Sequence, residues 1–309
     1  MPSYAFFQNQ IIPLSDAKMS VMTNFMHYGT GVFEGIRGNW NAEKKEMFIF
    51  CLREHYERLH KGCQVLNINL PYSIDDMCRI TVDVVEKCGF EEDVYIRPLA
   101  YKSSEALGVR LHDLDGDFLV FAFPWGRYLD TDKARCCVSS WRFPGEIPRA
   151  KLTGLYVTNG MAKTEAVQNG FDEAIMLTSE GYVAEGSGEN IFLVTDGHLV
   201  TPATYDGVLI GITRNVIMKL AEAELGIKTV ERHIARVELY NTEECFMTGT
   251  AAHITPIAEI DRRPVGDGEI GPITRKLQKI YADVIRGNNP KYAEMCTPVY
   301  KRAAVSQNR

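Results

Sequence analysis

The sequence has no long hydrophobic run, and this absence excludes one class of protein. No apolar stretch among the 309 residues approaches the roughly 20 that a membrane-spanning helix needs. The amino-terminal residues Met1 to Tyr4 also lack the basic and apolar regions of a signal peptide. We therefore expect a cytoplasmic protein that does not enter a membrane.

Basic residues are not in excess. The chain carries 34 Lys and Arg against 40 Asp and Glu, which gives a net charge of -6, and its pI is near 5.7. Binding to nucleic acid or to an anionic membrane surface needs a basic patch that neutralises phosphate groups. The composition predicts neither partner and favours a small-molecule substrate.

Motifs of metal and redox sites are also missing. The eight cysteines are scattered without a Cys-x-x-Cys pair, so we expect no zinc or redox centre and interpret most of them as buried thiols. His27, His55 and His60 lack the spacing of a metal site and are interpreted as core or surface histidines. The glycines within residues 29–35 do not match G-x-G-x-x-G, which argues against a nicotinamide enzyme.

Helices and strands alternate along the first half of the chain. Apolar residues at helical spacing predict helices over residues 53–67 and 73–89, and a capping-box pattern of Ser73 with Asp76 marks the start of the second. Strands are predicted over residues 94–101 and 118–123. The second of these strands is an almost continuous apolar run, so we expect it to be buried on both faces.

A break then separates two predicted domains. Pro124-Trp125-Gly126 and the polar stretch after it predict an interdomain loop over residues 124–133. Residues 1–123 would form a small N-terminal α/β domain and residues 134–309 a large domain, with a frayed tail after about residue 301. In the second domain we expect strands at 136–142, 173–177, 190–195 and 244–247, and helices at 154–169, 213–226 and 272–287.

Lys151, Tyr156 and Glu185 carry groups whose combination suits one cofactor. Pyridoxal phosphate needs a lysine that holds it covalently, a carboxylate at its pyridine nitrogen, a donor near its phenolate oxygen and a phosphate cup. Lys151 follows a predicted strand and a turn at Pro148, and Glu185 precedes the small-residue turn Gly186-Ser187-Gly188. Taken alone, Lys151 could be a solvated surface charge and the turn a hairpin with exposed glutamates.

Two short glycine-containing segments suit a phosphate group. Gly211-Ile212-Thr213 stands at the expected start of a helix, where backbone N–H groups and the positive end of the helix dipole attract an anion. Gly249-Thr250-Ala251-Ala252 follows a predicted strand and offers a hydroxyl group and more backbone donors. Each also has a plainer interpretation, and Thr213 would then be an ordinary N-cap.

Taken together, these segments resemble the fold-type IV pyridoxal phosphate enzymes, and most closely the branched-chain amino acid aminotransferases. The resemblance implies a two-domain fold of mixed α/β class like that of D-amino acid aminotransferase, with pyridoxal 5'-phosphate as cofactor. It also implies at least a homodimer, in which a loop of one small domain completes the neighbour's pocket. The residues that carry it occur in order along the chain: His27 to Arg37, Arg53 to His55, Arg58 to His60, Tyr95 to Pro98, Phe123 to Gly126, Lys151, Glu185 to Asn190, Gly211 to Arg214, and Gly249 to Ala252.

The resemblance implies a reaction and a role for each residue of the site. The reaction is transamination of leucine, isoleucine or valine with 2-oxoglutarate, which gives branched-chain 2-oxo acids and L-glutamate. Lys151 would be the catalytic residue. The implied cofactor contacts are Arg58, Tyr156, Glu185, Ile212, Thr213 and Thr250. The implied substrate contacts are Tyr28, Phe33, Tyr95, Arg97, Trp125, Tyr128, Ala251 and Ala252.

The aromatic members of this set suit an aliphatic substrate on physical grounds. They would remove water from the side chain, and each buried methylene contributes about 0.8 kcal/mol. Because the same pocket must accept glutamate, the resemblance assigns Arg97 to the side-chain carboxylate of that donor. Taken singly, each aromatic residue could belong to the core, and Arg97 could form an ion pair within the fold.

Other activities remain to be weighed. On the same fold, the chain could be a D-amino acid or (R)-amine aminotransferase, or an aminodeoxychorismate lyase. Tyr95-x-Arg97 with Phe33-Glu34-Gly35 favours the branched-chain group, because relatives of other stereochemistry place their carboxylate-binding arginines elsewhere. A noncatalytic binding protein is disfavoured by the joint presence of Lys151, Tyr156 and Glu185.

Overall fold

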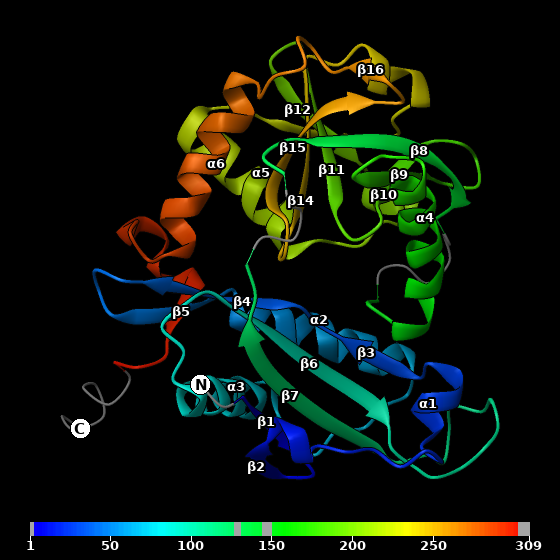
Figure 1. Cartoon of the computed structure of the whole chain (residues 1–309), viewed down its shortest axis with the longest axis vertical. Coiled ribbons are helices and arrows are strands. Elements are labelled where there is room, and N and C mark those ends of the chain that lie inside the picture. Colours follow the sequence, from blue (N-terminus) through cyan, green and yellow to red (C-terminus); the bar gives the residue numbers. More distant parts are fainter. Residues whose placement is uncertain (1–2, 127–130, 144–149, 302–309) are drawn as a thin grey trace. The chain divides into compact units, whose positions relative to one another are not determined.

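The computed structural model describes residues 3–126, 131–143 and 150–301, and the chain divides into two compact units. The first unit comprises Met1–Gly126, Ala150–Gly154 and Asp283–Arg309, and the second comprises Arg127–Arg149 and Leu155–Ala282. Each unit contains one large sheet with helices packed on it (Figure 1). The predicted mixed α/β fold class is therefore confirmed. The predicted frayed tail lies outside the described residues.

The first unit is built on an antiparallel sheet with the strand order β17-β5-β4-β6-β7-β1-β2, and β3 pairs with β6. Helix α3 packs on β1 and β7, and α2 packs on β3 and α3. Its strands are β1 (Tyr4–Phe7), β2 (Gln10–Pro13), β3 (Gly31–Phe33), β4 (Ile36–Asn41), β5 (Glu46–Phe50), β6 (Val94–Lys102), β7 (Gly116–Pro124) and β17 (Cys296–Pro298). Its helices are α1 (Asn24–Tyr28), α2 (Leu52–Val65) and α3 (Ile74–Cys88), with 3-10 turns at Leu14–Asp16 and Pro290–Met295.

Strand β7 corrects one prediction. Its buried residues Phe118, Val120 and Ala122 alternate with half-buried ones, so the strand is not buried on both faces. The reason is the antiparallel sheet, which packs one face against α2 and α3 and leaves the other face partly open. The apolar residues of the second face, Phe121 and Phe123, sit opposite Arg97 and Tyr95 of β6.

The second unit is built on a mixed sheet with the order β10-β9-β8-β15-β14-β11-β12-β13, and β16 pairs with β15. Helix α4 packs on β8 and β9, and α5 packs on β13 and β14. Its strands are β8 (Ala134–Arg142), β9 (Glu173–Leu177), β10 (Val183–Gly186), β11 (Asn190–Thr195), β12 (His198–Pro202), β13 (Thr229–Arg232), β14 (Glu244–Gly249), β15 (His253–Ile260) and β16 (Arg263–Pro264). Its helices are α4 (Tyr156–Gln168), α5 (Ile212–Leu225) and most of α6 (Pro272–Ile285), with 3-10 turns at Thr204–Asp206 and Arg236–Tyr240. A further 3-10 turn, Thr153–Leu155, spans the change from the first unit to the second along the chain.

The helix ends follow local sequence signals. Ser73 and Asp76 form the predicted capping box of α3, and Gly89 ends that helix at φ 66°. Gly226 ends α5 in the same way at φ 68°. Helix α4 begins at Tyr156, two residues later than predicted, because residues 153–155 form a 3-10 turn.

Two segments join the first unit although they follow the predicted interdomain loop. Residues 150–154 pair with β3, and β17 pairs with β5, so backbone hydrogen bonds hold both segments to the first sheet. The sequence places both in the second domain, and the domain division itself stays a prediction.

The cysteines agree with their interpretation as thiols. None of the eight forms a disulfide bond, and seven of them are buried. Within the described residues, no helix is both long and apolar enough to cross a membrane.

Candidate active site

Lys151 lies on a short segment that extends the first sheet. Leu152 forms an isolated antiparallel bridge with Val32, and the Phe33 amide donates a hydrogen bond to the Lys151 carbonyl at 3.1 Å. This pairing places the Lys151 amine 4.8 Å from the centre of the Phe33 ring. Because the residue is half-buried, it is not the solvated surface charge that its sequence alone allows.

Arg97 shares the Phe33 ring with Lys151. Its guanidinium carbon lies 4.8 Å from the centre of that ring and 5.2 Å from the centre of the Tyr95 ring. Arg97 Nη2 donates a hydrogen bond to the Tyr95 hydroxyl at 3.1 Å. Among the described residues Arg97 has no ion pair, and its Nε is buried without a hydrogen-bond partner. An ion pair within the fold therefore does not account for this arginine, which can receive an anionic ligand.

Aromatic rings surround this arginine. Trp125 packs edge-on against Tyr95 at 4.6 Å and stacks on Phe123 at 5.9 Å. The Trp125 carbonyl accepts a hydrogen bond of 2.7 Å from Arg37, a buried residue of β4. The structure thus brings together three predicted substrate residues of the first unit, Phe33, Tyr95 and Trp125, with Arg97.

One other predicted substrate residue, Tyr28, is not part of this group. Tyr28 ends α1, and its hydroxyl accepts a hydrogen bond from the Gly108 amide at 2.9 Å while 38% of the residue stays exposed. Tyr128 lies outside the described residues.

Arg58 belongs to a buried ionic network. Its Nε and Nη2 donate to the two carboxylate oxygens of Glu34, each at 2.7 Å, and His55 Nδ1 lies 2.7 Å from Oε2 of the same carboxylate. The side chains of Glu34, His55 and Arg58 are 0%, 2% and 13% exposed. Burial alone would raise the pKa of Glu34, but the Arg58 charge and the hydrogen bonds from Arg58 and His55 outweigh it and lower the pKa to about 2.

Glu185 is a buried carboxylate of the second unit. Its Oε2 accepts hydrogen bonds from the Asn190 side chain at 3.1 Å and from the Leu209 amide at 3.0 Å. Asn190 also donates to the Leu209 carbonyl at 2.8 Å, which ties the loop before α5 to the start of β11. Glu185 and Glu189 are 6% and 4% exposed, so the alternative of a hairpin with exposed glutamates is wrong.

The start of α5 offers backbone donors. Gly211 is the N-cap, and no side chain caps the helix, so the interpretation of Thr213 as an N-cap is also wrong. A side chain at position 211 would collide with the Asn190 amide oxygen, which explains the glycine. Ile212 and Thr213 are therefore the first residues of the helix, where free backbone N–H groups and the positive end of the helix dipole favour the binding of an anion.

The remaining predicted contacts are half-buried residues of the second unit. Tyr156 is the first residue of α4, and Thr250, Ala251 and Ala252 form the turn between β14 and β15. Ala252 accepts a hydrogen bond from the Thr255 hydroxyl through its carbonyl at 2.9 Å. Their roles stay predictions.

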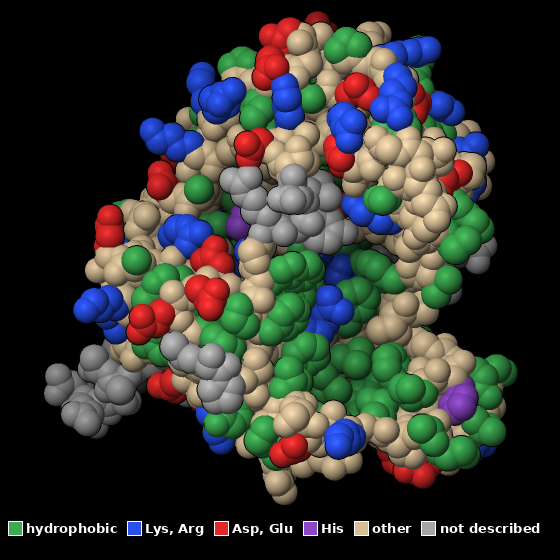
Figure 2. Space-filling view, viewed as in Figure 1, with side chains coloured by type: hydrophobic (Ala, Val, Ile, Leu, Met, Phe, Trp, Pro, Cys, Tyr) green, Lys and Arg blue, Asp and Glu red, His purple; other side chains and the backbone are tan. Residues whose placement is uncertain are grey.

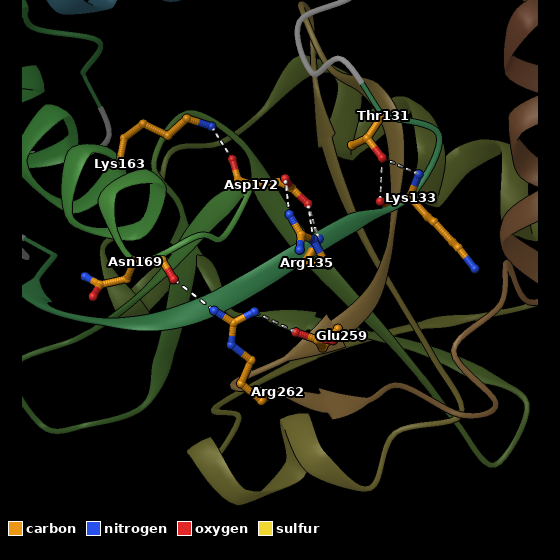
Figure 3. A network of polar contacts seen from close by, with 8 residues as sticks. All are labelled: Thr131, Lys133, Arg135, Lys163, Asn169, Asp172, Glu259 and Arg262. Carbon is orange, nitrogen blue, oxygen red and sulfur yellow. Dashed lines mark hydrogen bonds and ion pairs between the residues drawn. The ribbon is translucent and has the colours of Figure 1, made fainter.

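Glu189 has no predicted role, yet it lies in a crowded buried site. Burial and the neighbouring Glu173 raise its pKa to about 8, against an opposing effect of the Lys163 charge. Lys163 donates to Glu173 at 2.6 Å and to the Asp172 carbonyl at 2.7 Å. Asp172 in turn pairs with Arg135 of β8, as Figure 3 shows.

His27, His55 and His60 occupy core or surface positions, as interpreted from the sequence. His27 Nε2 contacts the Val21 carbonyl at 2.8 Å, and His60 is exposed on α2. His55 is buried, but its partner Glu34 was not expected. The spacing of His55 and Arg58 on one helix face is a signal that could have pointed to a shared partner.

Comparison with known proteins identifies the family of this chain. Residues 31–260 match the family model described as amino-transferase class IV. A protein of Aquifex aeolicus called a probable branched-chain-amino-acid aminotransferase is 48% identical over 303 residues, which cover 97% of both chains.

Solved structures give the same result. The branched-chain aminotransferase of Thermoproteus uzoniensis, crystallised with norvaline, is 41% identical with a TM-score of 0.91 over 97% of this chain and 99% of that one. The branched-chain amino acid aminotransferase of Thermobaculum terrenum in its PLP form is 38% identical, also with a TM-score of 0.91, over 96% and 98% of the two chains. The predicted two-domain fold type is confirmed by these matches. The chain belongs to the class IV aminotransferases and groups among them with the branched-chain amino acid aminotransferases.

Proposed function

We propose that this chain transfers the amino group of leucine, isoleucine or valine to 2-oxoglutarate, with pyridoxal 5'-phosphate as cofactor. One observation carries the proposal: the Lys151 amine and the Arg97 guanidinium each lie 4.8 Å from the centre of the same Phe33 ring. An amine and a guanidinium that share one aromatic ring suit a substrate that reacts at its α carbon and ends in a second carboxylate. The names of the relatives support the same activity.

The donor groups of each unit fit the cofactor. The second unit offers the buried carboxylate Glu185, hydrogen-bonded to the loop that leads into an uncapped helix start at Ile212. The first unit offers the guanidinium of Arg58, which is partly exposed and is held by its ion pair with Glu34. Pyridoxal phosphate, when bound, supplies an electron sink for the charge that develops at the substrate α carbon.

Each residue of the site then has a defined task. Lys151 would hold the cofactor covalently, and as a neutral amine it would move the proton of the substrate α carbon, for which the bound cofactor would supply the electron sink. Glu185 keeps the pyridine nitrogen protonated, and Tyr156 donates a hydrogen bond to the phenolate oxygen. The phosphate is bound by Arg58, Ile212, Thr213 and Thr250.

Substrate choice depends on the aromatic group and its arginine. The rings remove water from an aliphatic side chain, which favours leucine, isoleucine and valine. Arg97 pairs instead with the side-chain carboxylate when glutamate is the donor. The backbone of Ala251 and Ala252 holds the α-carboxylate. The rings in this proposal are Tyr28, Phe33, Tyr95, Trp125 and Tyr128.

A set of half-reactions tests the proposal. The yellow enzyme is mixed in turn with L-leucine, L-glutamate, D-alanine and aminodeoxychorismate, and conversion to the pyridoxamine form is followed by absorbance. We expect conversion by the first two. Conversion by D-alanine without conversion by L-leucine would show a D-amino acid aminotransferase instead. Borohydride reduction and peptide mapping should place the cofactor on Lys151, and a label on another lysine would refute its role.

A homodimer is part of the proposal. Large apolar side chains are exposed around α1 and the loop after β6, and Figure 2 shows hydrophobic side chains gathered on this part of the first unit. A second copy of the chain would cover them. The residues concerned are Val21, Met22, Met26, Tyr28, Leu107 and Val109. Light scattering should give twice the monomer mass or more, and an active monomer would contradict the proposal.

We also propose a cytoplasmic location. The structure has no disulfide bond among the eight cysteines, as is usual for proteins of reducing compartments. Fractionation of cells that make the protein should recover it with cytoplasmic markers.

A further inference from the structure

The carboxylate of Glu34 is the centre of a contact that the proposed function does not use. It lies between β3 and β4, where its own amide donates to the Pro98 carbonyl at 3.0 Å and so fixes the backbone at this point. Its two oxygens accept three hydrogen bonds of 2.7 Å, two from Arg58 and one from His55. Such charge-assisted contacts are short and directional.

The protonation of the network follows from its burial. The lowered pKa of Glu34 keeps the carboxylate ionised at working pH, so it accepts hydrogen bonds and donates none. Burial, opposed by Glu34 and reinforced by the charges of Arg58 and Lys151, lowers the pKa of His55, which is therefore neutral. A neutral imidazole that faces an ionised carboxylate must carry its proton on Nδ1.

The same contacts fix the direction of the guanidinium. His55 and Arg58 are three residues apart on α2 and so share one face of the helix. Glu34 engages Arg58 side-on, through Nε and Nη2. Because the guanidinium is planar, a side-on pair sets the direction of the opposite edge, which carries Nη1. A phosphate that binds arginine needs that edge in one orientation.

We propose that Glu34 and His55 are positioning residues, which hold the Arg58 guanidinium in the orientation that receives the cofactor phosphate. The inference rests on the proposed phosphate contact of Arg58. His55 acts through Glu34: its Nδ1 proton holds Oε2 in place, and Oε2 accepts from Arg58 Nη2. Neither residue is assigned a contact with the cofactor.

Pyridoxal, which lacks the phosphate, separates this role from a structural one. Full-length protein freed of cofactor is titrated with pyridoxal phosphate and with pyridoxal, and both dissociation constants are read from the absorbance of the bound aldehyde. We expect E34Q to weaken pyridoxal phosphate at least about tenfold and to leave pyridoxal within about twofold. Equal weakening of both ligands, or of neither, would overturn the inference.

Position 55 supplies a second pair of variants that does not remove the carboxylate. In H55N the side-chain amide can replace the Nδ1 donor, and in H55L no donor is left. We expect H55N to bind pyridoxal phosphate nearly as the parent does and H55L to bind it several times more weakly. Equal binding by the two variants would contradict the role of His55.

Two further variants complete the design. D75N breaks the exposed Arg53–Asp75 ion pair, which also joins an arginine of α2 to a carboxylate, and should leave both dissociation constants unchanged. R58K tests the proposed function itself. If R58K does not affect pyridoxal phosphate binding, the phosphate role of Arg58 fails. If R58K weakens binding while E34Q and H55L do not, the positioning role alone is refuted.

Discussion

A methyl group at Gly35 should impair the handling of glutamate. An ideal Cβ at this position would lie 2.8 Å from Tyr95 Cζ and still closer to its hydroxyl oxygen, whereas ordinary contacts begin at 3.4 Å. The Tyr95 ring would therefore have to move by at least about 0.6 Å in a region packed like a crystal. Its hydroxyl accepts the hydrogen bond from Arg97, so the arginine loses its support when the ring moves.

The expected loss of activity follows from this displacement of the Tyr95 ring. Misplacement of a substrate-binding group by about 1 Å costs on the order of a hundredfold in rate, so G35A should lower kcat/KM for L-glutamate by roughly tenfold to a hundredfold. L-leucine does not use the arginine and should be affected less. Overpacking should also lower the free energy of unfolding by about 1–3 kcal/mol.

Stopped-flow half-reactions with the two amino acids measure the effect. G160A is the matched control, because a Cβ at the exposed Gly160 meets no atom within 4 Å. Equal losses with L-leucine and L-glutamate would refute a specific role of the Tyr95–Arg97 contact. Unchanged rates with both amino acids would show that the Tyr95 ring is not held against Gly35 in the position that the structure gives.

Three further predictions concern stability. Because burial raises the pKa of Glu189 to about 8 from an ordinary 4.5, the folded protein holds a proton that the unfolded chain releases between these values. The free energy of unfolding should fall by at most about 1.4 kcal/mol per pH unit across that window, and urea melts of E189Q should lack this slope. The lowered pKa of Glu34 has the opposite sign: its contribution is complete above pH 4.5 and is lost as the pH falls towards 2, so melting temperatures of E34Q should depend less on acid than those of the parent. G160A should raise the free energy of unfolding by about 0.5–1 kcal/mol through helix propensity, and a lower value in urea melts would contradict an exposed position in α4.

Elements with strong local signals could be predicted from the sequence. The capping box and terminal glycine of α3 mark both of its ends, and the predicted strand over residues 173–177 matches β9. Short strands of the first sheet gave no such signal. For example, β3 has three residues, and its partners are β6 and the segment that holds Lys151. Pairing between such distant segments is a tertiary property that no local pattern encodes.

Some residues of the candidate site could likewise be predicted from the sequence, and others could not. Lys151 and Glu185 could be named as candidates from the sequence because the proposed chemistry needs their groups, and Arg97 could be named through the resemblance to the family. The partner that fixes Arg58 could not be, because Glu34 meets α2 only through the fold. Likewise the raised pKa of Glu189 depends on its burial beside Glu173, which a turn flanked by two glutamates does not reveal.

The two-residue period of a β-strand explains why Tyr95-x-Arg97 is a useful motif and why the prediction that β7 is buried on both faces is wrong. Tyr95 and Arg97 are two residues apart on β6, so their side chains lie on one face of the sheet. The register places Phe123 opposite Tyr95 and Phe121 opposite Arg97, so the same face continues across β7. An apolar run in β7 therefore serves two purposes. Phe118, Val120 and Ala122 fill the core, while Phe121 and Phe123 extend an aromatic surface around an arginine. Read by hydrophobicity, the run indicates a strand buried on both faces. When the two-residue period of the run is considered together with Tyr95-x-Arg97 on the neighbouring strand, the run indicates that one face of β7 belongs to the core and the other face to the site.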